Sequence, residues 1–358
     1  MADIRPIDIS PTEAEDPREA QIRAFLQTIG WGDADRGVLA RDASYRTYDR
    51  LHRGQETAVL MNAPPGLEDV GPFLDIAAQL HRFGYSAPRI LAQDEALGLL
   101  LIEDLGDRTF TRILADGGDE TALYEMAVDL LADLHHRAPE IGFDAPPYDI
   151  GRLSEEADRV LRWYLPLYTG AVDAGLQAEF DSLWRGHADV LCHGQQTLVL
   201  RDFHVDNLMV LDGRSGVARC GLLDFQDALS GPAAYDLVSL LQDARRDLAP
   251  GLESAMLERY RTATRTEEWD SFLRGYHALG AQRAIKIIGI FGRQLGFFGR
   301  TQYLKHLPRC WAHAMRDLER AGLGDLIAWL DRNIPAAYRE LPDESARLPA
   351  ALSPVIQR

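Results

Sequence analysis

The sequence predicts an α+β fold of two lobes, with a small β-rich N-terminal lobe and a large helical C-terminal lobe. Strand-like runs of Val, Leu, Tyr and Thr concentrate in the first 105 residues, whereas helical periodicity dominates after Gly106. A chain of 358 residues is long enough for one or two packed units. We therefore expect lobes at residues 1–105 and 106–340, followed by a proline-rich, loosely attached tail at 341–358.

The N-terminal lobe is expected to begin with an amphipathic helix at 17–29, which Pro17 opens. A second helix at 70–83 ends before Gly84, a residue type that commonly terminates helices. The remaining segments are short strands between polar turns, predicted at 38–41, 45–52, 57–62, 88–93 and 97–102. This lobe should therefore contain a leading helix and an antiparallel sheet with one helix packed on it.

The C-terminal lobe is predicted to be mainly helical. Apolar residues at helical spacing predict helices at 109–116, 119–137, 153–168, 175–190, 234–245, 252–264, 268–280, 281–292, 309–321 and 324–333. Strand-like runs interrupt these helices at 198–201, 208–211 and 219–224.

The overall composition excludes several classes of protein. The chain has 38 Lys and Arg against 55 Asp and Glu, a net charge of −17, which opposes nucleic-acid binding. Three cysteines without a C-x-x-C pair argue against a disulfide framework or zinc ribbon and favour a reducing compartment. The first residues lack the apolar core of a signal peptide, and no run of about 18 apolar residues occurs. We expect a soluble cytoplasmic protein whose partners include neither nucleic acid nor membrane.

The strongest chemical signal is the segment LVLRDFHVDNLMVLDG, which the segment CGLLDFQDA follows. Asp202 and Asn207 lie five residues apart, and Asp224 ends the next apolar run. A hairpin between these runs would bring the three side chains to one end of a sheet. Phosphoryl transfer needs a carboxylate that accepts a hydroxyl proton and oxygen ligands that hold Mg²⁺. Alone, the spacing of Asp202 and Asn207 also fits a polar turn.

These motifs resemble those of the aminoglycoside phosphotransferase and choline kinase superfamily, which has a protein-kinase-like fold. Further stretches resemble the kinases that phosphorylate the anomeric hydroxyl of N-acetylmuramate and N-acetylglucosamine in cell-wall recycling, namely DASYRTY, VLMNAPP, SAPRIL, LLIEDLGDRTF and QRAIKIIGIFGR. The resemblance runs from about residue 30 to 330. It implies an enzyme that uses ATP and Mg²⁺ and forms a sugar 1-phosphate.

The resemblance also implies roles for individual residues. Asp202 matches the catalytic base, and Asn207 and Asp224 match the two Mg²⁺ ligands. Asp236 matches a carboxylate that ties the following helix to the catalytic segment, although a purely structural role fits equally well. His204 is expected to fix the catalytic loop by a hydrogen bond.

The nucleotide residues are implied by the same resemblance. The backbone of Glu103, Asp104 and Leu105 matches the hinge that hydrogen-bonds adenine, and Arg41 to Tyr45 matches the turn over the ATP phosphates. Two positions depart from the family. Leu200 replaces the usual His of the catalytic loop, and Met61 replaces the phosphate-binding Lys.

The missing lysine leaves two readings open. An arginine of the first hairpin, Arg41 or Arg46, together with Ser44 and backbone amides, is expected to hold the phosphates, because a guanidinium binds phosphate through a bidentate fork. Met61 also fits a catalytically dead, nucleotide-binding protein.

The acceptor site is suggested by a cationic segment. Residues 281–310 contain no Asp or Glu but six cationic residues, namely Arg283, Lys286, Arg293, Arg300, Lys305 and Arg309. This charge favours an anionic acceptor such as N-acetylmuramate over a polycationic aminoglycoside, the acceptor of the alternative function. Arg293 and Arg300 are the predicted substrate ligands. Solvated helix faces or pairing to acidic neighbours would also explain the charges, and the aromatic 291–303 fits either packing or a sugar platform.

Overall fold

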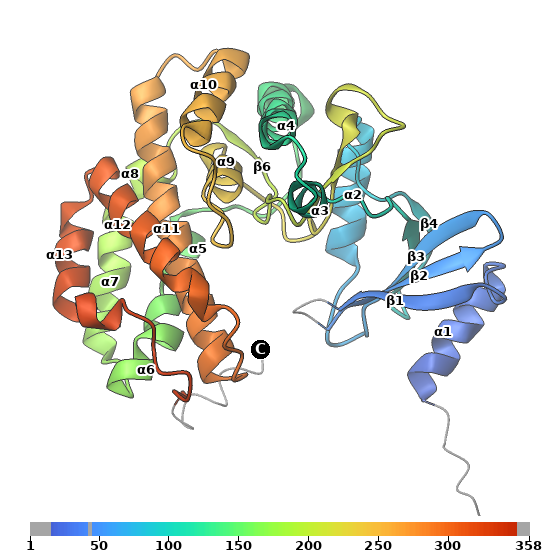
Figure 1. Ribbon diagram of the computed structural model, residues 1–358, viewed down its shortest axis with the longest axis horizontal. Helices are drawn as coiled ribbons and strands as arrows, with labels where there is room; N and C mark the ends of the chain where they lie inside the picture. The colour runs from blue at the N-terminus through green and yellow to red at the C-terminus, as the bar shows by residue number, and fades with distance from the viewer. Residues whose placement is uncertain (1–15, 42–44, 349–358) are drawn as a thin grey trace, which may run out of the picture. The chain divides into compact units, whose positions relative to one another are not determined.

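The computed structural model describes residues 16–41 and 45–348 (Figure 1). Within these residues the chain forms two compact units. The first unit runs to Asp75 and resumes at Pro88–Gly106, and the second comprises Ile76–Ala87 and the chain from Asp107 onward.

The first unit is built on a five-stranded antiparallel sheet in the order β1-β2-β3-β5-β4, which confirms the predicted architecture. The strands are β1 (Asp35–Arg41), β2 (Thr47–Arg53), β3 (Glu56–Asn62), β4 (Ile90–Asp94) and β5 (Leu99–Glu103). The helices are α1 (Pro17–Thr28) and the first part of α2 (Gly71–Arg82).

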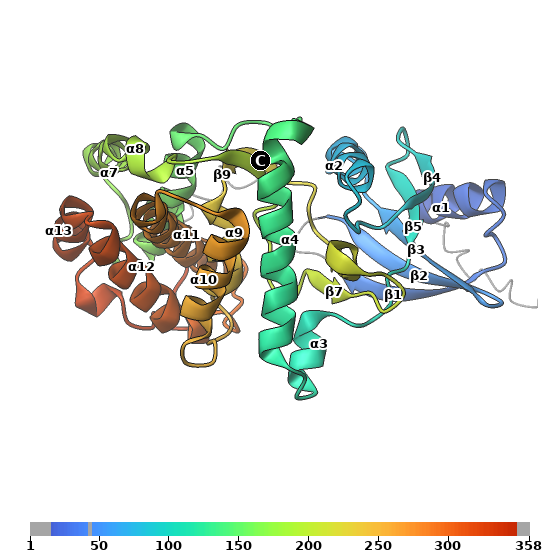
Figure 2. The same cartoon turned by 90° about the horizontal axis from the view of Figure 1, so that it is seen from above.

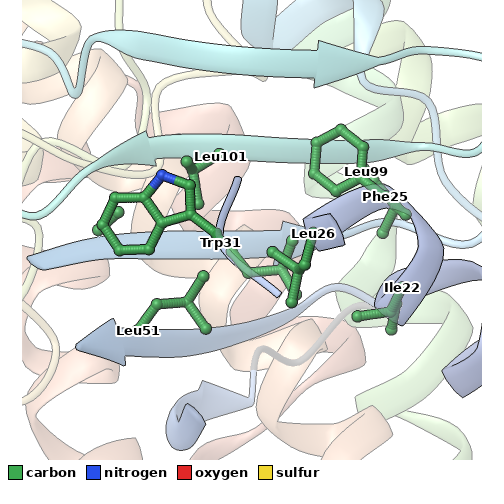
Figure 3. Packing of buried hydrophobic residues seen from close by; sticks show 9 residues of the cluster. Ile22, Phe25, Leu26, Trp31, Leu51, Leu99 and Leu101 are labelled. Atoms are coloured by element: carbon green, nitrogen blue, oxygen red, sulfur yellow. The ribbon is translucent and has the colours of Figure 1, made fainter. Parts of the chain in front are cut away.

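Helix α1 covers one face of this sheet. Asp16 caps it by accepting a hydrogen bond from Arg18 N at 2.9 Å, and Pro17 occupies its first turn. Its apolar side chains pack on the sheet in a cluster that Figure 3 shows, formed by Ile22, Phe25, Leu26, Trp31, Leu51, Ala58, Leu60, Leu99 and Leu101. Strand alternation places Val59 and Met61 on the opposite face of β3.

The second unit is mainly helical, as predicted. Its helices are α3 (Phe110–Ala115), α4 (Glu120–Ile141), α5 (Ile150–Ala157), α6 (Pro166–Thr169), α7 (Ala174–Gly186), α8 (Ala188–Leu191), α9 (Ala234–Leu241), α10 (Leu252–Thr264), α11 (Trp269–Gly296), α12 (Leu307–Ala321) and α13 (Gly324–Asn333). Among the helices described, none combines the length and the apolar composition that a bilayer span requires.

Helix α11 corrects the sequence prediction, which divided it into helices at 268–280 and 281–292. It is one helix of 28 residues, because its glycines are close packing contacts rather than helix ends. A Cβ at Gly289 would lie 2.3 Å from Arg159 C, and one at Gly292 would lie 2.8 Å from Trp163 O. The predicted helix at 153–168 is also divided, since a π-helical turn at Val160–Tyr164 separates α5 from α6 and packs against these glycines.

Two short antiparallel sheets carry the motif segment. Strands β7 (Leu208–Val210) and β8 (Cys220–Leu222) form the predicted hairpin. Strand β6 (Gln196–Val199) pairs instead with β9 (Leu229–Pro232), a strand that the sequence analysis missed because LSGP has no apolar alternation. Helix α4 runs beside these sheets (Figure 2).

The described part of the predicted tail is attached to the second unit. Leu348 N donates to Gly296 O at 3.1 Å, at the end of α11. Just before the tail, Tyr168 Oη donates to Glu340 O at 2.9 Å. These two contacts bind the chain at positions 340 and 348 to the second unit.

Candidate active site

A tight backbone turn presents Asp202 directly after strand β6. Asp202 N donates to Leu200 O at 2.9 Å, which closes a three-residue γ-turn around Arg201. Arg201 has a φ of 69°, in the left-handed region that residues with a side chain rarely adopt. The half-buried Asp202 is thus held by a strained backbone, which needs support from its surroundings.

Two side chains of α9 provide part of that support. The fully buried Asp236 accepts hydrogen bonds from Leu200 N at 2.7 Å and Arg201 N at 2.9 Å. Ser239 Oγ donates to Arg201 O at 3.0 Å. Burial raises the pKa of Asp236 to about 7, although the two backbone donors act in the opposite direction. Through these contacts Asp236 supports the backbone of the turn.

Asn207 and Asp224 lie together at the open end of the β7–β8 hairpin. Leu223 N donates to Asn207 O at 2.9 Å, immediately before Asp224. Asn207 Nδ2 donates to the backbone O of Asp202 at 2.9 Å. This bond fixes the amide so that its oxygen is the atom left to face a ligand. Gln226 Nε2 donates to Asp224 Oδ1 at 2.8 Å.

The donor set of this group suits a magnesium ion. An amide oxygen and a carboxylate are hard ligands, and Mg²⁺ in proteins typically binds through few side chains, keeping water and substrate phosphates as its other ligands. The hairpin thus brings together the three predicted residues Asp202, Asn207 and Asp224. Their individual roles remain predictions.

The charges around Asp202 favour its ionised form. Burial alone would raise the pKa of Asp202, but the positive charges of Lys286, Arg283 and Arg201 lower it below its usual value. Asp202 is therefore a carboxylate at neutral pH, able to accept a hydrogen bond or a proton.

His204 contributes to the turn through its backbone. His204 N donates to Asp202 O at 3.1 Å, and Asn207 N donates to His204 O at 2.9 Å. Its imidazole is buried, which lowers its pKa, and within the described residues its Nδ1 has no hydrogen-bond partner. The ring lies 3.9 Å from Asp206 Oδ2, measured from Nδ1.

One residue that contacts the turn before Asp202 was not predicted from the sequence, the buried Glu156 of α5. It binds Lys286 and Arg201, which lie 130 and 45 residues away in the sequence. The only sequence signal was Lys286, a charged residue in the otherwise apolar run AIKIIGIFG.

The predicted hinge residues lie at the end of β5 in the first unit. The side chain of Glu103 accepts hydrogen bonds from Arg89 N and Arg89 Nε at 3.2 and 3.1 Å. Asp104 accepts from Arg50 Nη2 at 3.0 Å and from Gly106 N at 2.9 Å. Because both carboxylates have protein partners, any contact with adenine would come from the backbone. Leu105 follows, half-buried.

The predicted phosphate-binding residues are described only in part. Ser44 and the side chain of Arg41 lie outside the described residues. Arg46 is buried, with its Nε 4.0 Å from Glu68 Oε2. Tyr45 N donates to Glu68 Oε1 at 3.0 Å, so Glu68 fixes the end of this turn.

Met61 is fully buried in β3, where it pairs with Tyr48 and Leu100. The position thus belongs to the apolar interior of the first unit. A lysine here would have to bury its ammonium group.

The two predicted acceptor residues meet at one aromatic ring at the end of α11. The guanidinium carbons of Arg293 and Arg300 lie 5.6 and 5.0 Å from the centre of the exposed Phe298 ring. Arg293 also lies 5.9 Å from the Trp163 ring, and Arg300 Nη1 donates to Gln294 Oε1 at 3.2 Å.

Other cations of residues 281–310 bind groups of the protein itself. Arg283 Nη2 donates to Ser239 Oγ at 2.8 Å, and Lys286 lies 2.9 Å from Glu156. Arg309 pairs with Asp247. For Lys286 and Arg309 the alternative expectation of pairing to acidic neighbours is confirmed, whereas Arg283 binds a hydroxyl.

Comparison with known proteins gives consistent matches. Residues 37–274, more than half of the chain, match the phosphotransferase enzyme family. The N-acetylmuramate/N-acetylglucosamine kinase of Caulobacter vibrioides is 37% identical over 364 residues, covering 90% of this chain and 98% of the relative. The protein of the same name from Pseudomonas aeruginosa is 33% identical, covering 90% of this chain and 100% of the relative.

Solved structures share the fold at low identity. The GDP complex of aminoglycoside 2'-phosphotransferase-IIIa has a TM-score of 0.57 at 12% identity, covering 84% of this chain and 100% of that chain. Choline kinase LicA from Streptococcus pneumoniae has a TM-score of 0.56 at 11% identity, covering 86% of this chain and 99% of that chain. These similarities confirm the predicted kinase-like fold.

Proposed function

The chain belongs to the phosphotransferase enzyme family, and we propose that it is an ATP-dependent kinase for the anomeric hydroxyl of N-acetylmuramate and N-acetylglucosamine. The products would be the sugar 1-phosphates of peptidoglycan recycling, formed in the cytoplasm, where ATP is available. Relatives named for this substrate pair align with 87 to 90% of the chain, which supports the choice of acceptor.

One arrangement carries the proposal, the group formed by Asp202, Asn207 and Asp224. The hairpin pairing next to Leu223 and the bond from Asn207 Nδ2 to Asp202 O place these residues side by side. A base beside two oxygen ligands is what phosphoryl transfer to a hydroxyl requires.

Asp202 would orient the anomeric hydroxyl and accept its proton as the hydroxyl oxygen attacks the γ-phosphoryl group. The low pKa of Asp202 keeps it ionised for this purpose. An anomeric hydroxyl is more acidic than other sugar hydroxyls, so a weak base is sufficient. The Asn207 amide oxygen and the Asp224 carboxylate would hold Mg²⁺, which when bound neutralises phosphate charge.

The first unit would bind the nucleotide. We assign adenine to the backbone of Glu103, Asp104 and Leu105, and the phosphates to the turn that ends at Arg46, including Arg41 and Ser44. The buried Met61 is an argument for a catalytically dead protein, but the retained Asp202 and its two neighbours argue for turnover.

We assign the lactyl carboxylate of N-acetylmuramate to Arg293 and Arg300. Both guanidinium groups flank Phe298, whose exposed ring could contact an apolar sugar face while the cations bind the carboxylate. This positive charge disfavours the alternative function, since a polycationic aminoglycoside would be repelled.

The test is turnover with ATP and Mg²⁺, followed by ³¹P NMR, against both amino sugars, their methyl glycosides and kanamycin. We expect both free sugars to give a 1-phosphate and the glycosides, which lack the hydroxyl, to give none. Asp202→Asn should lower kcat by about two to four decades with the fold intact. Phosphorylation of a methyl glycoside, or a preference for kanamycin, would contradict the anomeric assignment.

A further inference from the structure

Glu156 is a buried carboxylate contacted by four side chains of the second unit, one of which is Arg159, whose Nη2 lies 4.0 Å from Oε1. It is 3% exposed on α5. Lys286 Nζ of α11 lies 2.9 Å from its Oε2, to which Tyr148 Oη also donates. Arg201 Nη2 donates to its other oxygen, Oε1. Glu156 thus connects the turn that precedes Asp202 with two helices.

The bond to Arg201 acts on the strained residue of the turn. At Leu200 and Arg201, the side chains of Asp236 and Ser239 contact backbone atoms, whereas Glu156 binds the guanidinium. Arg201 Nη1 also donates to Asp227 O at 3.3 Å. Because Asp202 is the next residue, a rotation of the Arg201 backbone would redirect its carboxylate.

The elements that carry these contacts are themselves fixed. Helix α11 packs closely against the backbone of Arg159, three residues after Glu156, because Gly289 has no side chain. Lys286 lies one helical turn before Gly289 and also donates to Tyr235 Oη at 3.3 Å. Lys286 therefore holds Oε2 of Glu156 in place, while Oε1 accepts the hydrogen bond from Arg201.

Stability alone does not account for this group. A buried carboxylate between cations contributes little net stability compared with apolar side chains of the same volume, because desolvation offsets the attraction. The positive charges of Lys286 and Arg201 nevertheless hold the pKa of Glu156 at about 2, against the effect of its burial, so the group is ionised and directional.

We propose that Glu156 is a positioning residue for Asp202, acting through the guanidinium of Arg201 while Lys286 fixes its second oxygen. The inference rests on the proposed function, because it takes Asp202 as the base. Glu156 touches no reacting atom in this scheme, so its effect should appear in kcat rather than in substrate binding.

The test compares steady-state kinetics of Glu156→Gln, Arg201→Gly, Arg201→Lys and the double variant Glu156→Gln/Arg201→Gly. Displacing a catalytic group by about 1 Å lowers rates by about a hundredfold, so we expect kcat to fall about 10- to 100-fold in the first two variants. The KM values for ATP and sugar should stay within about twofold. Arg201→Lys should recover part of kcat, because it keeps a cation facing Glu156.

Arg201→Gly keeps the test decisive even if Glu156→Gln fails to fold. Glycine adopts a positive φ without strain, so this variant should remain folded while losing the side-chain contact. In the double variant, kcat should be within about twofold of Arg201→Gly, because both changes remove one interaction.

Asp317→Asn is the matched control. Asp317 is fully buried and bound by His277 Nδ1 at 2.9 Å and Arg316 Nε at 3.1 Å. It should lower the melting temperature and leave kcat within about twofold. Two results would overturn the positioning role of Glu156: an unchanged kcat in Arg201→Gly, or a loss of kcat in the double variant equal to the product of the two single losses. If Asp202→Asn is inactive in the same experiments, the proposed function is unaffected by either result. Full turnover of Asp202→Asn would overturn the base assignment as well.

Discussion

Replacing Gly289 with alanine tests the packing of α11 against the segment that joins α5 to the π-helical turn. A Cβ at this position would lie 2.3 Å from Arg159 C, 2.5 Å from Arg159 O and 2.6 Å from Val160 N. All three atoms belong to the backbone of the α5 to π-turn segment. No side-chain rotation can relieve the overlap, so the two segments must separate.

The expected destabilisation follows from these distances. Ordinary contact begins near 3.4 Å, so the backbones must separate by about 1 Å. Overpacking of this kind typically costs about 1–3 kcal/mol and sometimes more. Alanine in place of glycine gains about 1 kcal/mol in helix propensity. We expect a net loss of about 2 kcal/mol, because the overlap involves backbone on both sides.

Thermal unfolding of paired variants measures this effect. Gly289→Ala should lower the melting temperature by about 4–8 °C, at about 2–4 °C per kcal/mol for a unit of this size. Gly186→Ala, at the exposed end of α7 with no atom within 4 Å of the added Cβ, should leave it unchanged or raise it slightly. If Gly289→Ala proved as stable as Gly186→Ala, the close packing of α11 on Arg159 would be refuted.

Four further predictions follow from the site. Asp224→Ala should reduce turnover more than Asn207→Ala, because the aspartate carries a charge, and excess Mg²⁺ should partly rescue Asn207→Ala. A titration of the rate against Mg²⁺ concentration measures both effects. A wild-type rate that does not depend on Mg²⁺ would contradict the assignment of a metal site. Met61→Lys should destabilise the protein by about 3 kcal/mol or more in urea unfolding, because the lysine ammonium would be buried without a partner. A large gain in activity would instead indicate that the wild-type phosphate site lacks the cation that this lysine supplies. Arg293→Ala should raise KM for N-acetylmuramate more than for N-acetylglucosamine, and equal effects would remove its assignment to the carboxylate. The pKa of Glu156 is about 2 in the folded protein against an ordinary value of 4.5, so at a pH above 4.5 its ionisation stabilises the fold by on the order of 3 kcal/mol. The difference in unfolding free energy between wild type and Glu156→Gln should therefore shrink as the pH falls from about 5 toward 2. A difference that stayed constant over this pH range would be inconsistent with this linkage.

The parts of the fold that the sequence predicted well are those that local patterns determine. The first-unit strands are short apolar runs between polar turns, and the β7–β8 hairpin joins neighbouring segments around Asn207 and Asp224. Strand β9 was missed because Leu229–Pro232 pairs with a strand about 30 residues earlier and has no pattern of its own. Helix α11 was divided at Gly280, which looks like a helix breaker until its close neighbours Asp317 and Gln242 are known.

The candidate site residues could be located by motif, but the geometry that supports Asp202 could not. The spacing of Asp202, Asn207 and Asp224 is local, so the resemblance located them directly. Nothing in the spacing shows that Arg201 has a positive φ or that a carboxylate 45 residues earlier binds it. Such contacts depend on how α5 packs, which is a property of the assembled unit.

The cationic segment shows how far a charge count can be taken. Counted together, six cations without a carboxylate predict a site for an anion. In the folded chain Arg283, Lys286 and Arg309 bind Ser239, Glu156 and Asp247, and these contacts serve the protein itself. Arg293 and Arg300 instead flank Phe298, a half-exposed ring beyond the last buried turn of α11. The location of these two residues, rather than the total charge, therefore favours an anionic acceptor. Arg293→Ala tests this preference more directly than Lys286→Met would, because loss of Lys286 would also disturb Glu156.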